Sequence, residues 1–97
     1  MDMNQVVEEF KVQAANAKPL GATIKFLLDD QPIIIDGTGD ANQVSQGDGE
    51  ADCTIITSGE TLEKLKSGDL NPMMAVMSGK VKIQGDMGLA MKLQSLI

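Results

Sequence analysis

The apolar residues change their spacing at Lys18-Pro19, and this change limits the folds open to the chain. Residues 3–17 carry apolar side chains at the i, i+3, i+4, i+7 spacing of a helix with one buried stripe. Residues 22–28 alternate apolar and polar side chains, as a strand with one solvated face does. The helix ends at Lys18-Pro19 because a residue before proline is disfavoured in the helical conformation. With 97 residues the chain has room for one domain, so we predict an α+β domain over residues 1–97.

The same two patterns continue toward the C-terminus. Strands are predicted at 33–36, 51–57 and 80–84, with a short edge strand at 42–46, and strand 33–36 is joined to strand 22–28 as a hairpin. Thr57-Ser58-Gly59-Glu60 has the spacing of a capping box and predicts a helix that stops at Ser67-Gly68. Asn71-Pro72 combines an N-cap with proline in the first turn, so a further helix begins there. A last helix is predicted over residues 87–97.

The composition excludes most catalytic chemistry. The chain has no histidine, and so it lacks the usual general base, the imidazole of a Ser or Cys triad and the commonest zinc ligand. Its single cysteine, Cys53, lies in an alternating apolar strand, where burial disfavours a reactive thiolate. Asp29 and Asp30 fall in a solvated turn, which is a poor place for an acid–base pair. The acidic residues of the 37–50 loop do not follow the EF-hand spacing. We predict a protein that is not an enzyme and has no metal site and no cofactor.

The charge argues against nucleic acid as a partner. The formal net charge is −6 at pH 7, whereas phosphate binding requires clustered cations. The first 60 residues hold 3 lysines and 11 acidic residues, and the remaining 37 hold 5 lysines and 3 acidic residues. Lys80 and Lys82, in the more basic part, either meet anionic head groups in a transient membrane contact or form the wet face of a strand. No secretory signal and no membrane-spanning apolar run is visible, so we expect a cytoplasmic protein.

Methionines and one glutamine mark the last predicted helix. Five of the 7 methionines lie in residues 61–97, and methionine adapts to irregular apolar shapes. Met87, Ala90, Met91 and Gln94 follow the i, i+3, i+4, i+7 spacing and share one face of the helix. The apolar residues surround this helix more widely than packing on one sheet face requires. Two interpretations follow: the stripe lines a ligand site with Gln94 at a head group, or it fills the core and Gln94 marks where it meets water.

Three C-terminal motifs together resemble the sterol carrier protein 2 (SCP2) family. They are Asn71-Pro72 through Ala75, Ser78-Gly79-Lys80-Val81-Lys82-Ile83 with Gly85, and Met87-Gly88-Leu89-Ala90-Met91-Lys92-Leu93-Gln94. The order of predicted helices and strands is similar from residue 1 onward. The resemblance implies a five-stranded, mainly antiparallel sheet with helices packed on one face, which together enclose an apolar tunnel. It also implies a protein without catalytic residues of its own.

The resemblance further implies an intracellular lipid-binding and lipid-transfer protein, a monomer or weak dimer. The ligand classes of the family are fatty acids, fatty acyl-CoA esters, sterols and phospholipids. Ser95-Leu96-Ile97 lacks the lysine of the peroxisomal S-K-L address, which favours the cytoplasm over the peroxisome. The alternative is a protein–protein interaction or dimerisation module that serves a partner enzyme of lipid metabolism. The lipid-binding residues implied by the resemblance are Phe26, Ile55, Met74, Met77, Ile83, Met87, Ala90, Met91 and Gln94.

Overall fold

The computed structural model describes residues 2–92. Its first element, α1 (Met3–Ala15), is the amphipathic helix that the apolar spacing predicts, although it ends two residues earlier than predicted. Asp2 caps its start, where the carboxylate accepts a hydrogen bond from the Asn4 N–H at 3.0 Å. Asn16 caps its end through a backbone N–H that donates to the last turn. Both ends of the helix are therefore fixed by local hydrogen bonds before the chain reaches the sheet.

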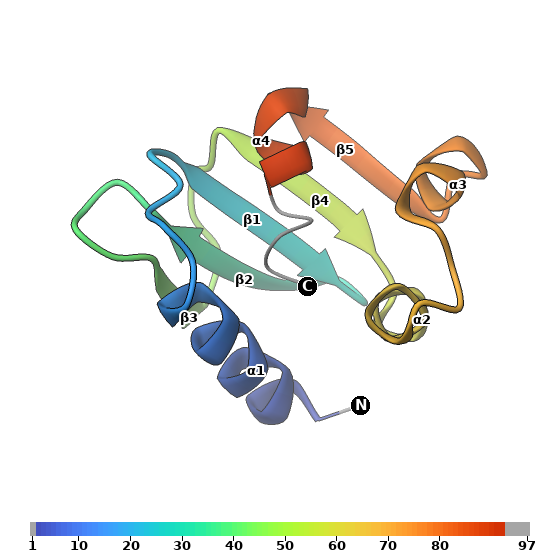
Figure 1. Ribbon diagram of the computed structural model, residues 1–97, viewed down its shortest axis with the longest axis horizontal. Helices are drawn as coiled ribbons and strands as arrows, with labels where there is room; N and C mark the ends of the chain where they lie inside the picture. The colour runs from blue at the N-terminus through green and yellow to red at the C-terminus, as the bar shows by residue number, and fades with distance from the viewer. Residues whose placement is uncertain (1, 93–97) are drawn as a thin grey trace.

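Five strands form one sheet. They are β1 (Thr23–Leu28), β2 (Gln31–Asp36), β3 (Gln43–Gln46), β4 (Cys53–Thr57) and β5 (Val81–Gly85). Their order is β3-β2-β1-β4-β5 (Figure 1), and neighbours are antiparallel except β1 and β4, which are parallel. Asp29 and Asp30 join β1 to β2 with φ angles of 50° and 67°, as in tight hairpins. The predicted five-stranded, mainly antiparallel sheet is thus confirmed, with one parallel pair.

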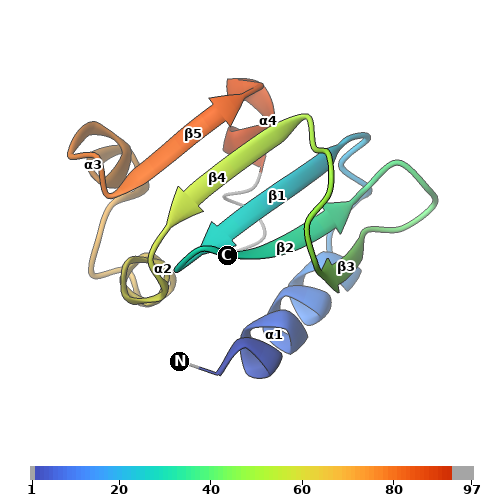
Figure 2. The same cartoon turned by 180° about the vertical axis from the view of Figure 1, so that it is seen from behind.

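The connection from β3 to β4 crosses the face of the sheet that the helices leave open (Figure 2). It crosses because β3 is an edge strand, whereas β4 pairs with β1 on the far side of β2. Lys25 holds the connection in place, since its ammonium group lies 3.0 Å from the Asp48 carboxylate. The hydrogen bond from Lys25 is the main cause that lowers the pKa of Asp48 below its ordinary value. The open face is therefore partly covered by the chain itself.

Three further helices complete the fold. They are α2 (Gly59–Ser67), α3 (Pro72–Met77) and α4 (Met87–Lys92). α1 lies at the β3–β2 side of the sheet, α4 lies over β4 and β5, and α2 and α3 lie at the end where β4 finishes and β5 begins (Figure 1). The predicted capping box of α2 is wrong by one residue. Ser58, not Thr57, is the N-cap, and its hydroxyl accepts the Thr61 N–H at 3.1 Å because Thr57 still belongs to β4.

The hydrophobic core lies between the helices and the inner face of the sheet. Phe10 of α1 packs on Phe26 of β1, with ring centroids 5.0 Å apart. Alternation in β1 sends Ile24, Phe26 and Leu28 into this core, as the two-residue period predicts. The buried apolar residues are Val6, Val7, Phe10, Ala14, Leu20, Ile24, Phe26, Leu28, Ile33, Ile35, Cys53, Ile55, Leu62, Ala75, Val81, Leu89 and Ala90.

Asn42 is a buried amide that ties α1 to the sheet. Its oxygen accepts the Leu20 N–H at 2.9 Å, and its NH₂ group donates to the carbonyls of Ala14 and Lys18 at 3.3 and 3.0 Å. Asn42→Ala is expected to lower the free energy of unfolding by about 2 kcal/mol, because a buried N–H loses its partner. Urea unfolding measures this loss. Asn16→Ala, at an exposed amide, is the matched control, and equal effects of the two substitutions would contradict the prediction.

Candidate functional site

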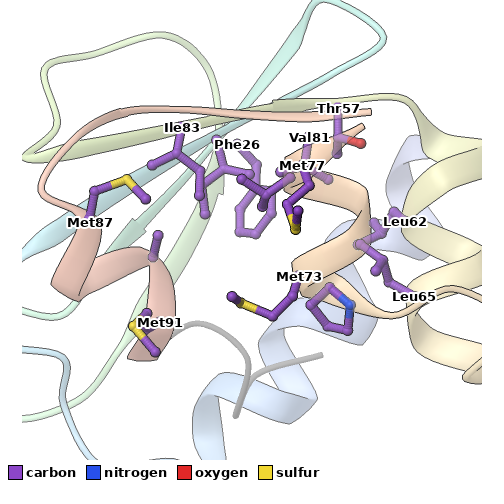
Figure 3. Close-up of a pocket in the computed structure, with 14 residues that line it drawn as sticks. Phe26, Thr57, Leu62, Leu65, Met73, Met77, Val81, Ile83, Met87 and Met91 are labelled. Atoms are coloured by element: carbon purple, nitrogen blue, oxygen red, sulfur yellow. The ribbon is translucent and has the colours of Figure 1, made fainter. Parts of the chain in front are cut away.

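An apolar cavity of about 230 Å³ lies between α2, α3, α4 and the inner face of β1, β4 and β5 (Figure 3). Its floor is buried and is formed by strand residues together with Leu62 of α2 and Ala90 of α4. Leu62 is 2% exposed and Ala90 is 9% exposed. The full lining consists of Phe26, Ile55, Thr57, Leu62, Leu65, Pro72, Met73, Val76, Met77, Val81, Ile83, Met87, Ala90 and Met91.

Exposed methionines form the rim of the cavity. Met73 and Met77 reach it from α3, and Met87 and Met91 reach it from α4 on the other side (Figure 3). These four side chains are from 55% to 78% exposed, although methionine is more often buried. Because unbranched thioether side chains change shape easily, the rim can adapt to apolar molecules of different outline. The burial pattern thus gives the cavity a fixed floor and an adaptable mouth.

Among residues 2–92, the lining of the cavity lacks the groups that acid–base or nucleophilic chemistry requires. Thr57 is the only lining residue with a polar side chain among residues 2–92, and its hydroxyl already donates to the Lys80 carbonyl at 3.0 Å. In the same range, no three His, Cys, Asp or Glu side chains form a group that could hold a metal ion. No helix within residues 2–92 is both long and apolar enough to cross a bilayer. The described lining can therefore bind an apolar molecule by exclusion of water, and it supplies no charged partner.

The structure brings most of the predicted site residues together at this cavity. Seven of them line it: Phe26, Ile55, Met77, Ile83, Met87, Ala90 and Met91. Met74 is not among the residues that line it. On a six-residue helix, Met73, Val76 and Met77 share the i, i+3, i+4 face toward the cavity, whereas Met74 lies about 100° around the axis from Met73. Gln94 lies outside the described residues.

Sequence reasoning missed the contribution of α2. Leu62 and Leu65 line the cavity from this helix, at an i, i+3 spacing that is visible in the sequence. That spacing is equally typical of an ordinary core stripe, so it carried no sign of a cavity. Val81 is another lining residue that the sequence did not reveal. Alternation in β5 predicts that Val81 and Ile83 point to the inner face of the sheet, but it does not predict that a cavity lies there.

The two lysines singled out in the sequence lie in different places. Lys80 adjoins α3 and the cavity end of the sheet, since its N–H donates to the Ala75 carbonyl at 2.9 Å. Lys82 is exposed on β5 between Val81 and Ile83, which both line the cavity. Because side chains alternate along a strand, Lys82 points to the opposite face of the sheet. Neither lysine lines the cavity, and of the two Lys80 is the one joined to α3 by a backbone hydrogen bond.

Cys53 is buried on β4 and is not part of the cavity lining. Burial is the main cause that raises the pKa of its thiol above the ordinary 9.0, and the nearby Asp86 charge adds to the effect. A protonated, buried thiol is a poor nucleophile, which agrees with the prediction that Cys53 is not catalytic.

Cys53 is expected to react with Ellman's reagent at least about tenfold more slowly in the folded protein than in urea. Because the unfolded thiol ionises first, stability is expected to fall as the pH rises through 9.0, and the fall ends above the raised pKa. Unfolding at several pH values measures this, and Cys53→Ala is expected to remove this part of the pH dependence. Rapid labelling of the folded protein would contradict the prediction.

Comparison with known proteins identifies the family. The model of the SCP-2 sterol transfer family matches residues 3–97. Sterol carrier protein 2 of Rattus norvegicus is 38% identical over 86 residues, which cover 81% of this chain and only 16% of the rat protein. The crystal structure of sterol carrier protein 2 like 2 from Aedes aegypti matches with a TM-score of 0.79 at 22% identity, covering 98% of this chain and 95% of that chain. The solution structure of the palmitated Aedes protein matches with a TM-score of 0.77 at 22% identity, covering 99% and 94%. The family match, the relatives and the fold agree, and this chain belongs to the SCP-2 sterol transfer family.

Proposed function

We propose that this chain binds the apolar part of one lipid molecule in the cavity and carries it through water without altering it. The ligand classes are fatty acids, fatty acyl-CoA esters and sterol-like molecules. The observation that carries the proposal is the cavity itself, an apolar space with a buried floor and a methionine rim. Membership of the SCP-2 sterol transfer family and the palmitated state of the Aedes aegypti relative support the same ligand class.

Hydrophobic transfer provides the driving force for binding. Each methylene removed from water contributes about 0.8 kcal/mol, so ten buried methylenes contribute about 8 kcal/mol before the cost of lost ligand motion. The described lining offers no charged side chain to recognise a particular head group. Selection inside the cavity therefore depends on shape, and the methionine rim makes that selection broad. We accordingly propose a carrier that accepts several kinds of apolar chain.

Lys80 supports a transient contact between the cavity end of the molecule and an anionic membrane. Charge reversal by Lys80→Glu is expected to slow lipid transfer to anionic vesicles about fivefold, because one lysine near such a surface contributes about 1 kcal/mol. Lys82→Glu, two residues farther along β5 from the contact with α3, is the matched control and is expected to change the rate less. Transfer between fluorescently labelled vesicles measures both rates. Equal rates for the two variants and the unmodified protein would exclude this contact.

The proposal is tested by native mass spectrometry of the purified chain, followed by solvent extraction and titration with a fluorescent fatty acid. Lipid retained at one molecule per chain, or saturable uptake of the fluorescent acid, is the expected result.

The second candidate function is a docking module for a partner enzyme. Its basis is that the chain spans only 16% of the rat relative and exposes apolar side chains on α3 and α4. A chain that holds no lipid and takes up no fatty acid would favour this second function.

A further inference from the structure

A second cavity of about 550 Å³ opens between α1 and α2. Its buried walls are apolar and include Val6 and Phe10 of α1 and Leu62 of α2. Its rim is polar and charged, because Glu9 of α1 and Lys66 of α2 also line it and form an ion pair across the gap. This cavity therefore combines an apolar wall with charged groups, which the described lining of the first cavity lacks.

The two cavities are separated by very little protein. Leu62 lines both of them, so opposite sides of one side chain face the two spaces. Beside it, Phe10 lines the second cavity and Phe26 lines the first, and these two rings are in direct contact. A rotamer change of Leu62 is a small motion compared with a movement of either helix. The partition can therefore open without rearrangement of the fold.

We propose that the second cavity holds the carboxylate end of a fatty acid whose acyl chain lies in the first cavity, with Leu62 as the movable partition. Lys66 then donates to the ligand carboxylate in place of Glu9. This inference rests on the proposed lipid-binding function. The two cavities suit different parts of a fatty acid. A carboxylate is strongly disfavoured in the apolar lining of the first cavity, whereas the charged rim of the second cavity offers it a cationic partner and contact with water.

The Glu9–Lys66 pair is suited to such an exchange. The side chain of Lys66 is 34% exposed and that of Glu9 is 47% exposed, and an ion pair so accessible to water contributes little to stability. The ligand replaces one carboxylate by another, so the ammonium group of Lys66 keeps a partner throughout. The buried acyl chain holds the ligand carboxylate at a high local concentration beside Lys66, so it can compete with Glu9, which is itself held there by the protein chain.

The test compares palmitate with hexadecanol, which has the same chain length and no charge. Lys66→Met keeps the length of the side chain and removes its charge, and it is expected to weaken palmitate binding about tenfold while hexadecanol binding stays the same. Lys64→Met, on the same helix but outside both cavities, is the control and should affect neither ligand. Unchanged palmitate binding, or an equal loss for both ligands, would overturn the proposal and leave the head group at the methionine rim. If the unmodified chain binds neither ligand, the lipid-binding function itself fails.

The partition is tested separately with Leu62→Ala. Joining the cavities is expected to raise the preference for palmitate over the shorter laurate about fourfold, the contribution of one additional buried methylene. Leu28→Ala, at a buried leucine that lines neither cavity, is the control for a general loss of packing. An unchanged preference in Leu62→Ala, or the same shift in both variants, would show that Leu62 does not separate the two ends of the ligand.

Discussion

Replacement of Ala90 by phenylalanine is expected to weaken fatty-acid binding on the order of 100-fold in Kd. Ala90 lies on α4, forms part of the cavity floor and is 9% exposed, so a larger side chain there occupies ligand space. Each excluded methylene costs about 0.8 kcal/mol, and exclusion of roughly four lowers the affinity by about 3 kcal/mol. Titration with a fluorescent fatty acid measures the loss. Urea unfolding of the same variant is needed beside it, because overpacking costs about 1–3 kcal/mol of stability.

Ala15→Phe provides the matched control. Ala15 is exposed at the end of α1 and lines neither cavity, so the same enlargement there should leave the affinity unchanged. If Ala90→Phe binds fatty acid as tightly as the unmodified chain while it remains folded, the ligand does not occupy the first cavity. That outcome would move the site to the space between α1 and α2 and would remove the main support for the proposed function.

The sequence predicted the individual strands better than their arrangement. Alternation identifies Ile24, Phe26 and Leu28 as an inward face because burial repeats every second residue along a strand. It contains no information on which strand lies next to which. The parallel pairing of Ile24 with Cys53 joins residues far apart in the chain, and only the complete core decides it. The local pattern alone therefore left the strand order open. The mainly antiparallel sheet was expected from the family resemblance, and that expectation was correct.

The residues of the candidate site also fall into a part that the sequence predicts and a part that it does not. The stripe of Met87, Ala90 and Met91 was visible in the sequence, and the structure places all three at the cavity. The orientation of α3 was not predictable, because a helix of six residues makes less than two turns and has no long stripe to define its inner face. Its fully buried Ala75 fixes that orientation through contacts with the rest of the core, and Met73 rather than Met74 is turned to the cavity.

Gly85→Ala is expected to cause the largest loss of stability, about 3–5 kcal/mol. Gly85 ends β5 with a φ of 95°, in a region that costs other residues about 1–2 kcal/mol. An added methyl group would also collide with the backbone carbonyl of Asp52, which accepts the Asp86 N–H at 3.1 Å. The substitution therefore strains the end of β5 and the hydrogen bond that leads into α4. Urea unfolding monitored by circular dichroism measures the loss.

Gly39→Ala is the matched control, because nothing lies within 4 Å of an added methyl group there and its φ is not in the positive range. A change of no more than about 0.5 kcal/mol is expected for it. Fatty-acid affinity separates two consequences of Gly85→Ala, since α4 carries Met87 and Ala90 of the cavity. If the strain stays at the start of α4, affinity falls while the chain is still folded, and if it spreads through the sheet, affinity and structure are lost together. A variant as stable as Gly39→Ala, with unchanged affinity, would show that β5 and α4 adapt to the methyl group and that Gly85 is not required to position the site.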